Sequence, residues 1–495
     1  MPLGLSGKFN VLARSPHDLE PEEPEPIDAP ESGAIHWVPS RYNIRAVTAD
    51  GRLVVWNTFR GTLSIFEPPQ RPAIERILRR GGVLARGEGA ILYLFERGFL
   101  LKEGTDEFRR IRLEFGRQHY RNDVLQFILM ASEDCNFRCE YCYEDFARGT
   151  MKPWVREGIK KLVEKRLDTI KFLSVSWFGG EPLYGWEAIE DLGPYFVETA
   201  EKHSIHFSGQ MTTNGYLLTP EVAEKLLAWK VRSFQITLDG APQDHDRNRP
   251  GRDGSGTFST IFENLRALRD RPEPFAVDLR VNFDPKNIPG MPELLDLVAR
   301  EFQDDRRFRL RFRAVGKWGG ANDDQISVCT DDEAGRWQFA LKDEARKRGI
   351  ALSDDIREIQ GFGGQACYAA RPYNFIIGAT GKVMKCTIDL DKQDRNDVGK
   401  LTADGDLQLD LDKFAVWTDP AFESDAKCQK CVVVPICQGL YCPIVRWDEG
   451  RSPCTSLRME AKHEIRAMAE EAPRKRVTVV NGQGVERRVA PPPSA

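Results

Sequence analysis

A regular alternation of strand-like and helix-like segments over residues 120–320 constrains the fold of this 495-residue chain more than any other feature. Short apolar runs with strand composition alternate there with segments of helical periodicity. This alternation is typical of parallel βαβ units, whose functional side chains gather at the carboxyl ends of the strands. The expected strands are Val124–Met130, Phe172–Phe178, Ile205–Thr212, Ser233–Leu238, Ala276–Phe283 and Phe308–Val315. The expected helices lie near Val155–Leu167, Trp186–His203, Pro220–Trp229, Phe258–Arg269 and Met291–Glu301.

The 11 cysteines are distributed unevenly, and this pattern indicates metal binding rather than a disulfide framework. None precedes Cys135, and seven fall between Cys367 and Cys454. Cys135, Cys139 and Cys142 form a C-x3-C-x2-C motif directly after the first expected strand. Three thiolates at this spacing can hold three irons of a four-iron cluster and leave the fourth iron open. A structural zinc knuckle has a similar spacing, so the motif alone leaves the metal undecided.

Glycine-rich and polar motifs follow the next strands. Gly179 and Gly180 would let the backbone approach a ligand, and Glu181 with neighbouring carbonyl groups could accept hydrogen bonds from an ammonium group. Taken singly, the Asn-Gly and Asp-Gly pairs after the third and fourth strands are equally typical of turns. The candidate ligand-binding residues are Gly179, Gly180, Glu181, Pro182, Thr213, Asn214, Asp239 and Arg280.

The cysteine motif, the Gly179–Pro182 sequence and the later polar motifs occur in strand order, and together they resemble the radical S-adenosylmethionine (radical SAM) superfamily. The resemblance covers roughly residues 120–315 and implies a partial (β/α)6 TIM-like barrel. It further implies that Cys135, Cys139 and Cys142 hold a [4Fe-4S] cluster whose open iron binds S-adenosylmethionine. Reductive cleavage would then give a 5′-deoxyadenosyl radical that removes a hydrogen atom from the substrate.

The downstream cysteines resemble the SPASM extension of peptide-modifying radical SAM enzymes, which adds two auxiliary [4Fe-4S] clusters, three clusters in all. The resemblance implies one auxiliary cluster fully ligated by Cys428, Cys431, Cys437 and Cys454. It implies a second, held by Cys367, Cys386 and Cys442, with one open iron. Four residues separate Cys437 from Cys442, where the family usually has three. Cys329 is the one remaining candidate ligand, although a small buried side chain is its simpler interpretation.

The segments before and after the barrel complete the predicted α/β organisation. The layout of residues 36–118 resembles a winged-helix leader-peptide recognition domain, with strands at Tyr42–Val47, Leu53–Trp56 and Thr62–Phe66 and a helix at Arg71–Arg80. A cap that merely packs on the barrel is the alternative. The predicted domains are a disordered acidic, Pro-rich tail (1–34), the winged-helix-like domain (36–118), the barrel (120–320), a helical bridge (321–365), the SPASM domain (366–470) and a C-terminal tail (471–495).

Composition excludes some classes of function. With 71 basic and 75 acidic residues, the net charge of −4 does not favour nucleic acid or a membrane surface as a partner. The chain has no apolar run of about 20 residues and no signal-peptide pattern, so we expect a cytoplasmic protein.

The function that these patterns favour is maturation of a ribosomally made precursor peptide, whose leader binds to residues 36–118. The product would be an intramolecular cross-link, with a thioether favoured over a carbon–carbon or carbon–oxygen bond, and a flavodoxin- or ferredoxin-type protein would supply electrons. Sulfatase-maturing relatives place a catalytic aspartate directly after the cysteine that corresponds to Cys386, whereas this chain has Thr387 there. Asp389 is therefore the candidate base, and formylglycine formation is an alternative. A non-catalytic, metal-stabilised peptide-binding scaffold is another.

Overall fold

The computed structural model describes residues 36–83, 89–353, 361–390, 392–452, 454–470, 478–480 and 486–488. The chain divides into two compact units. This division differs from the predicted domains, because parts of residues 366–470 belong to each of the two units. The barrel unit comprises Arg121–Ser353 and Arg371–Thr418. The terminal unit comprises Met1–Tyr120, Asp354–Ala370 and Asp419–Ala495. The predicted tail at 1–34 lies outside the described residues.

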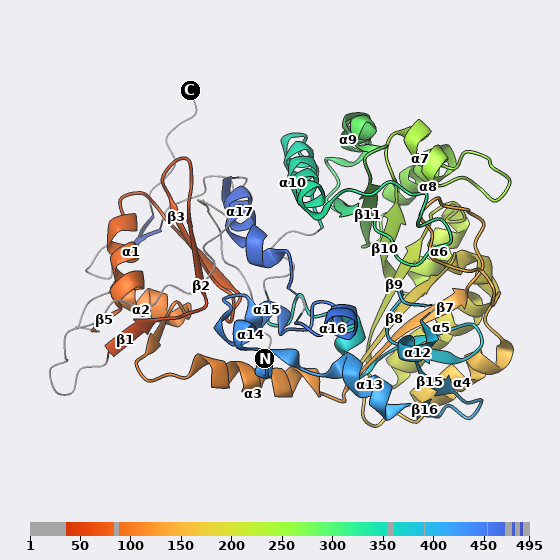
Figure 1. Ribbon diagram of the computed structural model, residues 1–495, viewed down its shortest axis with the longest axis horizontal. Helices are drawn as coiled ribbons and strands as arrows, with labels where there is room; N and C mark the ends of the chain where they lie inside the picture. Colours follow the sequence, from red (N-terminus) through yellow and green to blue (C-terminus); the bar gives the residue numbers. More distant parts are fainter. Residues whose placement is uncertain are drawn as a thin grey trace. The chain divides into compact units, whose positions relative to one another are not determined.

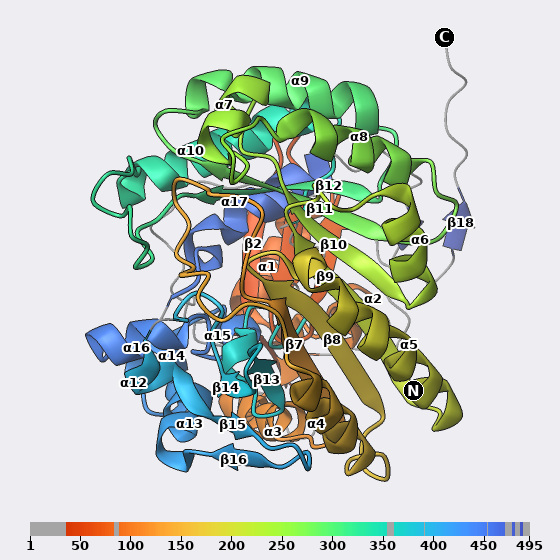
Figure 2. The same cartoon turned by 90° about the vertical axis from the view of Figure 1, so that its right-hand side faces the viewer.

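Parallel strands arranged in chain order form the centre of the barrel unit (Figure 2). Their side chains alternate between two faces, as in β8, where Leu173, Val175 and Trp177 are buried. The predicted α/β class with a parallel sheet is therefore confirmed. The strands are β7 (Val124–Ser132), β8 (Phe172–Gly179), β9 (His206–Thr213), β10 (Val231–Thr237), β11 (Ala276–Phe283) and β12 (Phe308–Ala314).

Helices connect these strands, and Figure 2 shows α4, α5, α6 and α8 in front of the sheet. α6 illustrates why they form: the Thr219 side chain caps the helix, Pro220 occupies its first turn, and Leu226 and Leu227 are buried. α7 was not predicted because its sequence lacks apolar periodicity. The helical segments are α4 (Pro153–Glu164), η1 (Pro182–Gly185), α5 (Trp186–Lys202), α6 (Pro220–Ala228), α7 (Pro242–Asn248), α8 (Phe258–Arg269), η2 (Ile288–Gly290), α9 (Met291–Phe302) and α10 (Asp331–Lys347).

The sheet continues beyond β7, which the sequence did not predict. β13 (Asn374–Ile377) pairs with β7 in parallel, and three antiparallel strands follow it to complete a 10-stranded sheet. These strands are short, and β13 pairs with a strand remote in sequence, so the local pattern carries little signal. The other elements of this segment are β14 (Lys382–Met384), α12 (Gln393–Asn396), β15 (Asp397–Leu401), β16 (Leu407–Leu409) and α13 (Leu411–Thr418).

The terminal unit begins with two small antiparallel sheets (Figure 1). One has the order β2-β3-β4 and corresponds to the three predicted strands, and the other has the order β5-β1-β6 and was not predicted. The predicted helix at Arg71–Arg80 is α1. The elements are β1 (His36–Pro39), β2 (Asn43–Val47), β3 (Leu53–Asn57), β4 (Thr62–Phe66), α1 (Arg71–Arg80), β5 (Gly82–Val83), α2 (Gly89–Glu96), β6 (Leu100–Lys102) and α3 (Glu107–His119).

The C-terminal part of the same unit packs onto the first of these sheets. Leu457 and Ile465 of α17 share a buried core with Ile44, Val54 and Trp56 of β2 and β3. Two paired strands lie within the predicted C-terminal tail. No described helix has the length and apolar character needed to cross a membrane. The elements are η3 (Tyr368–Ala370), η4 (Ala421–Glu423), α14 (Ala426–Lys430), α15 (Val434–Cys437), α16 (Pro443–Glu449), α17 (Leu457–Glu470), β17 (Thr478–Val480) and β18 (Glu486–Arg488).

Candidate functional site

The first three cysteines lie in the loop that follows β7, at the carboxyl end of the parallel sheet. Cys135 is buried, and Cys139 and Cys142 are partly buried. The backbone N–H of Phe137 donates to Cys135 Sγ at 3.4 Å. Burial raises the pKa of the Cys135 and Cys142 thiols to about 12. These thiols therefore hold their protons until a metal displaces them, and cluster binding would release protons.

The loop after β8 packs directly on this cysteine loop. Gly180 N donates to Ser132 O at 3.1 Å, and Glu181 N donates to Asp134 O at 3.0 Å. A Cβ atom on Gly179, whose φ is +132°, would lie 1.9 Å from Ser132 O, and one on Gly180 would lie 2.7 Å from Asp134 O. The close approach predicted for these glycines is thus made to the backbone at the end of β7 and at the start of the cysteine loop.

Glu181 joins three loops through its buried carboxylate. Oε1 accepts from Leu183 N at 2.9 Å and from Thr213 Oγ1 at 2.8 Å, and Oε2 accepts from Asn214 N at 2.7 Å. The Asn214 side chain in turn donates to Asn136 Oδ1 at 2.8 Å in the cysteine loop. Burial raises the pKa of Glu181 to about 7, although these hydrogen bonds oppose the change. The carboxylate therefore positions the predicted Thr213 and Asn214 beside the cysteines.

Tyr141 anchors the cysteine loop to the ends of β10 and β11. Its hydroxyl accepts from Arg249 Nη1 at 2.6 Å and from Asn282 Nδ2 at 2.9 Å, and it donates to Asp239 Oδ2. The other Asp239 oxygen accepts from Asn282 N at 2.8 Å, and Arg280 Nε donates to Asn282 Oδ1 at 2.7 Å. The structure thus brings the predicted Asp239 and Arg280 into one network. Sequence reasoning missed Arg249, because it belongs to no motif that the sequence analysis used.

A segment after α7 lies along the cysteine loop. Three backbone hydrogen bonds join them: Arg138 N to Pro250 O at 3.0 Å, Glu140 N to Asn248 O at 2.9 Å and Arg252 N to Asn136 O at 2.9 Å. This pairing fixes the loop through contacts that are independent of its covalent connection with β7.

His245 is a buried structural residue of the same region. Its Nδ1 accepts from Asp239 N at 3.2 Å, and its Nε2 lies 3.2 Å from Thr257 Oγ1. Burial, with the charge of Arg249, holds the pKa of His245 well below its usual range. The ring is therefore neutral, and its hydrogen bonds hold the loop after β10 in place.

For the S-adenosylmethionine cleavage that the sequence resemblance implies, we expect Tyr141→Phe to slow the rate by tenfold to about a hundredfold. The buried donors and the acceptor that share the Tyr141 hydroxyl would lose their partner, at a cost of about 1–3 kcal/mol. Tyr143→Phe is the matched control, since the Tyr143 hydroxyl forms no hydrogen bond with any described residue. The measurement is the rate of 5′-deoxyadenosine release, with iron content determined in parallel. Equal rates in the two variants would contradict the anchoring role.

Four of the downstream cysteines line a single cavity of about 130 Å³ in the terminal unit. They come from α14, the turn after it, the end of α15 and the segment before α17. Cys437 and Cys428 are buried, whereas Cys454 is exposed. Burial raises the pKa of the Cys428 thiol to about 11 and that of Cys437 to about 12. The structure thus brings together the complete predicted set Cys428, Cys431, Cys437 and Cys454.

Within the described ranges, no three His, Cys, Asp or Glu side chains converge closely enough to hold a single metal ion. In a cubane cluster each thiolate binds a different iron, so the sulfur atoms lie farther apart than around one zinc ion.

The remaining predicted ligands are divided between the two units. Cys367 and Cys442 belong to the terminal unit, and Cys386 belongs to the barrel unit. The loop of Cys386 is organised by Asn396, whose Oδ1 accepts from Cys386 N at 2.9 Å and whose Nδ2 donates to Cys386 O at 2.8 Å. A shared cluster for these three cysteines stays a prediction.

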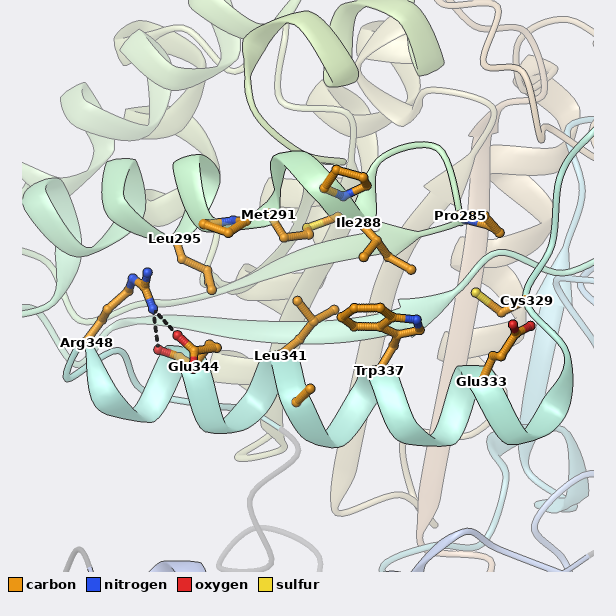
Figure 3. A pocket seen from close by; sticks show the side chains of 13 residues that line it. Pro285, Ile288, Met291, Leu295, Cys329, Glu333, Trp337, Leu341, Glu344 and Arg348 are labelled. Atoms are coloured by element: carbon orange, nitrogen blue, oxygen red, sulfur yellow. Dashed lines mark hydrogen bonds and ion pairs between the residues drawn. The ribbon is translucent and has the colours of Figure 1, made fainter.

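Cys329 lies apart from the other cysteines of the barrel unit. It lines a mostly apolar cavity of about 500 Å³ between α9 and α10, together with Trp337, Leu341 and Met291 (Figure 3). No other cysteine is among the described residues that line this cavity. These surroundings favour a small packing side chain, and this role for Cys329 stays a prediction.

Asp389 is held in a bidentate ion pair. Arg395 Nη2 donates to its Oδ1 at 2.9 Å, and Arg395 Nε donates to its Oδ2. The carboxylate is buried, and its backbone carbonyl accepts from Asn396 Nδ2 at 2.9 Å. This arrangement gives Asp389 a structural role in the Cys386 loop. The action of Asp389 as a base stays a prediction. The ion pair with Arg395 disfavours it, because both carboxylate oxygens already accept hydrogen bonds.

Comparison with known proteins agrees with this site. Residues 129–298 match the model of the radical SAM superfamily. The radical SAM cyclopropyl synthase TigE of Paramaledivibacter caminithermalis is 27% identical over 201 residues, which are 36% of this chain and 40% of TigE. The mycofactocin maturase MftC of Mycolicibacterium smegmatis is 24% identical over 320 residues, which are 62% of this chain and 74% of MftC. The chain thus matches less than half the length of TigE.

A solved structure shares the fold. Native anSMEcpe with bound AdoMet and Kp18Cys peptide is 18% identical, with a TM-score of 0.51, and the superposition covers 70% of this chain and 97% of that chain. The fold, the cysteine loop and the family match define a radical SAM domain, the catalytic domain of an enzyme superfamily. Residues 129–298 of this chain accordingly belong to a radical SAM domain.

Proposed function

We propose that this protein is a radical SAM/SPASM maturase of a ribosomally made peptide. The observation that carries the proposal is the convergence of four strand-end loops on Cys135, Cys139 and Cys142. Glu181 and Tyr141 tie those loops together through buried hydrogen bonds. Such rigid positioning is what a cluster with one open iron requires for binding a small ligand in a single orientation.

The residues of this site fit S-adenosylmethionine on a [4Fe-4S] cluster. The three thiols supply the cluster ligands, and Thr213, Asn214, Asp239 and Arg280 supply polar groups beside them. When both are bound, the cluster and S-adenosylmethionine would supply a 5′-deoxyadenosyl radical that removes a hydrogen atom from the peptide. Cys135 is buried, and its sulfur accepts a hydrogen bond from a backbone N–H group. Burial and hydrogen bonds to sulfur are two of the factors that set the reduction potential of an iron–sulfur cluster.

The cavity lined by Cys428, Cys431, Cys437 and Cys454 supports a SPASM domain with a fully ligated auxiliary cluster. We assign Cys367, Cys386 and Cys442 to a second auxiliary cluster, whose open iron would bind a cysteine thiolate of the peptide. This open iron is the reason for favouring a thioether over a carbon–carbon or carbon–oxygen cross-link. A flavodoxin- or ferredoxin-type protein would supply the electron for each turnover.

The leader of the precursor peptide would bind to residues 36–118. Support comes from the three-stranded β2-β3-β4 sheet, in which β4 is an edge strand, followed by three helices. An extended peptide can add to such an edge through backbone hydrogen bonds. The peptide bound to anSMEcpe in its solved structure is consistent with a peptide substrate for this fold. Formylglycine formation is the weaker alternative, because Thr387 replaces the expected aspartate and Asp389 is paired with Arg395.

The test is anaerobic reconstitution of the full-length protein with iron and sulfide, followed by reduction with dithionite in the presence of S-adenosylmethionine. We expect a brown protein with about twelve irons, as three cubane clusters require, and release of 5′-deoxyadenosine. A colourless protein that retains zinc after reconstitution and releases no 5′-deoxyadenosine would refute the proposal and favour the non-catalytic scaffold.

A further inference from the structure

A positive charge lies beside the cavity lined by the four cysteines. Arg458, in the first turn of α17, has its Nη1 3.8 Å from Cys454 Sγ and lines the same cavity as Cys428, Cys431 and Cys437. An arginine side chain is protonated at every physiological pH. A permanent cation therefore accompanies the sulfur atoms that are proposed to hold the auxiliary cluster.

The charge of Arg458 is not neutralised by a neighbouring carboxylate. In the described part of the chain its guanidinium has no ion-pair partner, and the polar contact it makes is the one with Cys454. Arg451 lines the same cavity but is exposed, and its Nε pairs with Glu449 at 2.5 Å. The charge of Arg451 is thus compensated by the Glu449 carboxylate, whereas the charge of Arg458 is directed at Cys454 without such a partner.

Reduction of an iron–sulfur cluster adds one electron to a group that already carries thiolate charges. A nearby cation stabilises the more negative, reduced state more than the oxidised state, and a hydrogen bond to a ligand sulfur acts in the same direction. We propose that Arg458 raises the reduction potential of the cluster held by Cys428, Cys431, Cys437 and Cys454. This inference rests on the proposed function, because it requires that a cluster occupies this cavity.

The experiment uses the full-length protein in which Cys135, Cys139 and Cys142 are alanine, so that the auxiliary clusters alone contribute signals. An electron paramagnetic resonance redox titration then gives the midpoint potential of each auxiliary cluster. We expect Arg458→Gln to lower the midpoint of one cluster and to leave the other unchanged. Arg458→Lys, which keeps the charge, should restore most of the potential.

Arg451→Gln is the matched control, because it removes an arginine from the same cavity whose charge is already paired. We expect it to shift the midpoint much less than Arg458→Gln does. Iron content and the absorption spectrum verify that each variant retains its clusters. If Arg458→Gln loses iron, Arg458→Met, which is neutral and has a similar stem, takes its place with the same expected shift.

Two results would overturn the inference, and they differ from each other. If both auxiliary clusters are present and the neutral Arg458 variant has the midpoints of the parent protein, the role of Arg458 is wrong and the proposed function stands. If the parent protein contains zinc and shows no iron–sulfur absorption, the proposed function itself fails, and the inference fails with it.

Discussion

Replacing Cys135, Cys139 and Cys142 with alanine is expected to abolish 5′-deoxyadenosine release and to remove about four of about twelve irons. The reason is that these thiolates are the proposed protein ligands of the cluster that would cleave S-adenosylmethionine, and no other cysteine lies in their loop. The measurement combines iron analysis with chromatography of the reaction products under anaerobic conditions. The auxiliary clusters should remain, because their ligands lie in other parts of the chain.

Cys329→Ala is the control for this variant. Its thiol lines the α9–α10 cavity, so its loss should leave both the iron content and the cleavage rate close to those of the parent protein. Persistence of cleavage in the triple variant would show that the cluster site has been assigned to the wrong residues. Loss of iron in Cys329→Ala would instead show that Cys329 is a ligand after all.

Gly179→Ala is expected to have the second largest effect. Its φ of +132° is unfavourable for alanine, and the added Cβ would lie 1.9 Å from Ser132 O, a backbone atom at the end of β7, directly before the cysteine loop. We expect a loss of stability of about 1–3 kcal/mol from overpacking. Because a displacement of about 1 Å costs about a hundredfold in rate, cleavage should fall by about that factor or more.

The matched control is Gly104→Ala. Gly104 also has a positive φ, +79°, but a Cβ there meets no atom within 4 Å, so the variant bears the backbone strain without the clash. Urea unfolding gives the change in stability, and 5′-deoxyadenosine release gives the rate. Similar cleavage rates in the two variants would show that contact between the Gly179 loop and the cysteine loop does not matter for activity.

Local patterns predicted the barrel strands well because each has seven to nine residues, which is long enough for a recognisable strand pattern. Ala276–Phe283 was predicted to the residue, and Phe172–Gly179 within one residue. The pattern failed for β13, β14 and β5, which have between two and four residues and depend on partners elsewhere in the chain. It also failed for α7, whose sequence is polar. Hydrogen bonds that His245 and Asp246 of this helix accept from the backbone N–H groups of Asp239 and Thr257 hold it in place.

The motifs of the candidate site were predicted from the sequence, but the hydrogen bonds that join these motifs were not predicted. Spacing identified Cys135, Cys139, Cys142 and the loop of Glu181, because each motif is contiguous in sequence. It could not show that Glu181 bonds to Asn214 or that Tyr141 bonds to Asn282, since such pairs are set by the register of neighbouring strands.

The sequence by itself determined that this chain carries a parallel α/β domain with a three-cysteine motif after its first strand, because periodicity and spacing are local properties. Only the tertiary structure decided which groups surround the cysteines. It brought Arg249 to Tyr141, enclosed four distant cysteines in one cavity with Arg458, and placed Cys329 in a separate one. The residues that surround each cysteine come from segments far apart in the chain. Tertiary packing brings these segments together, and local sequence patterns do not record it.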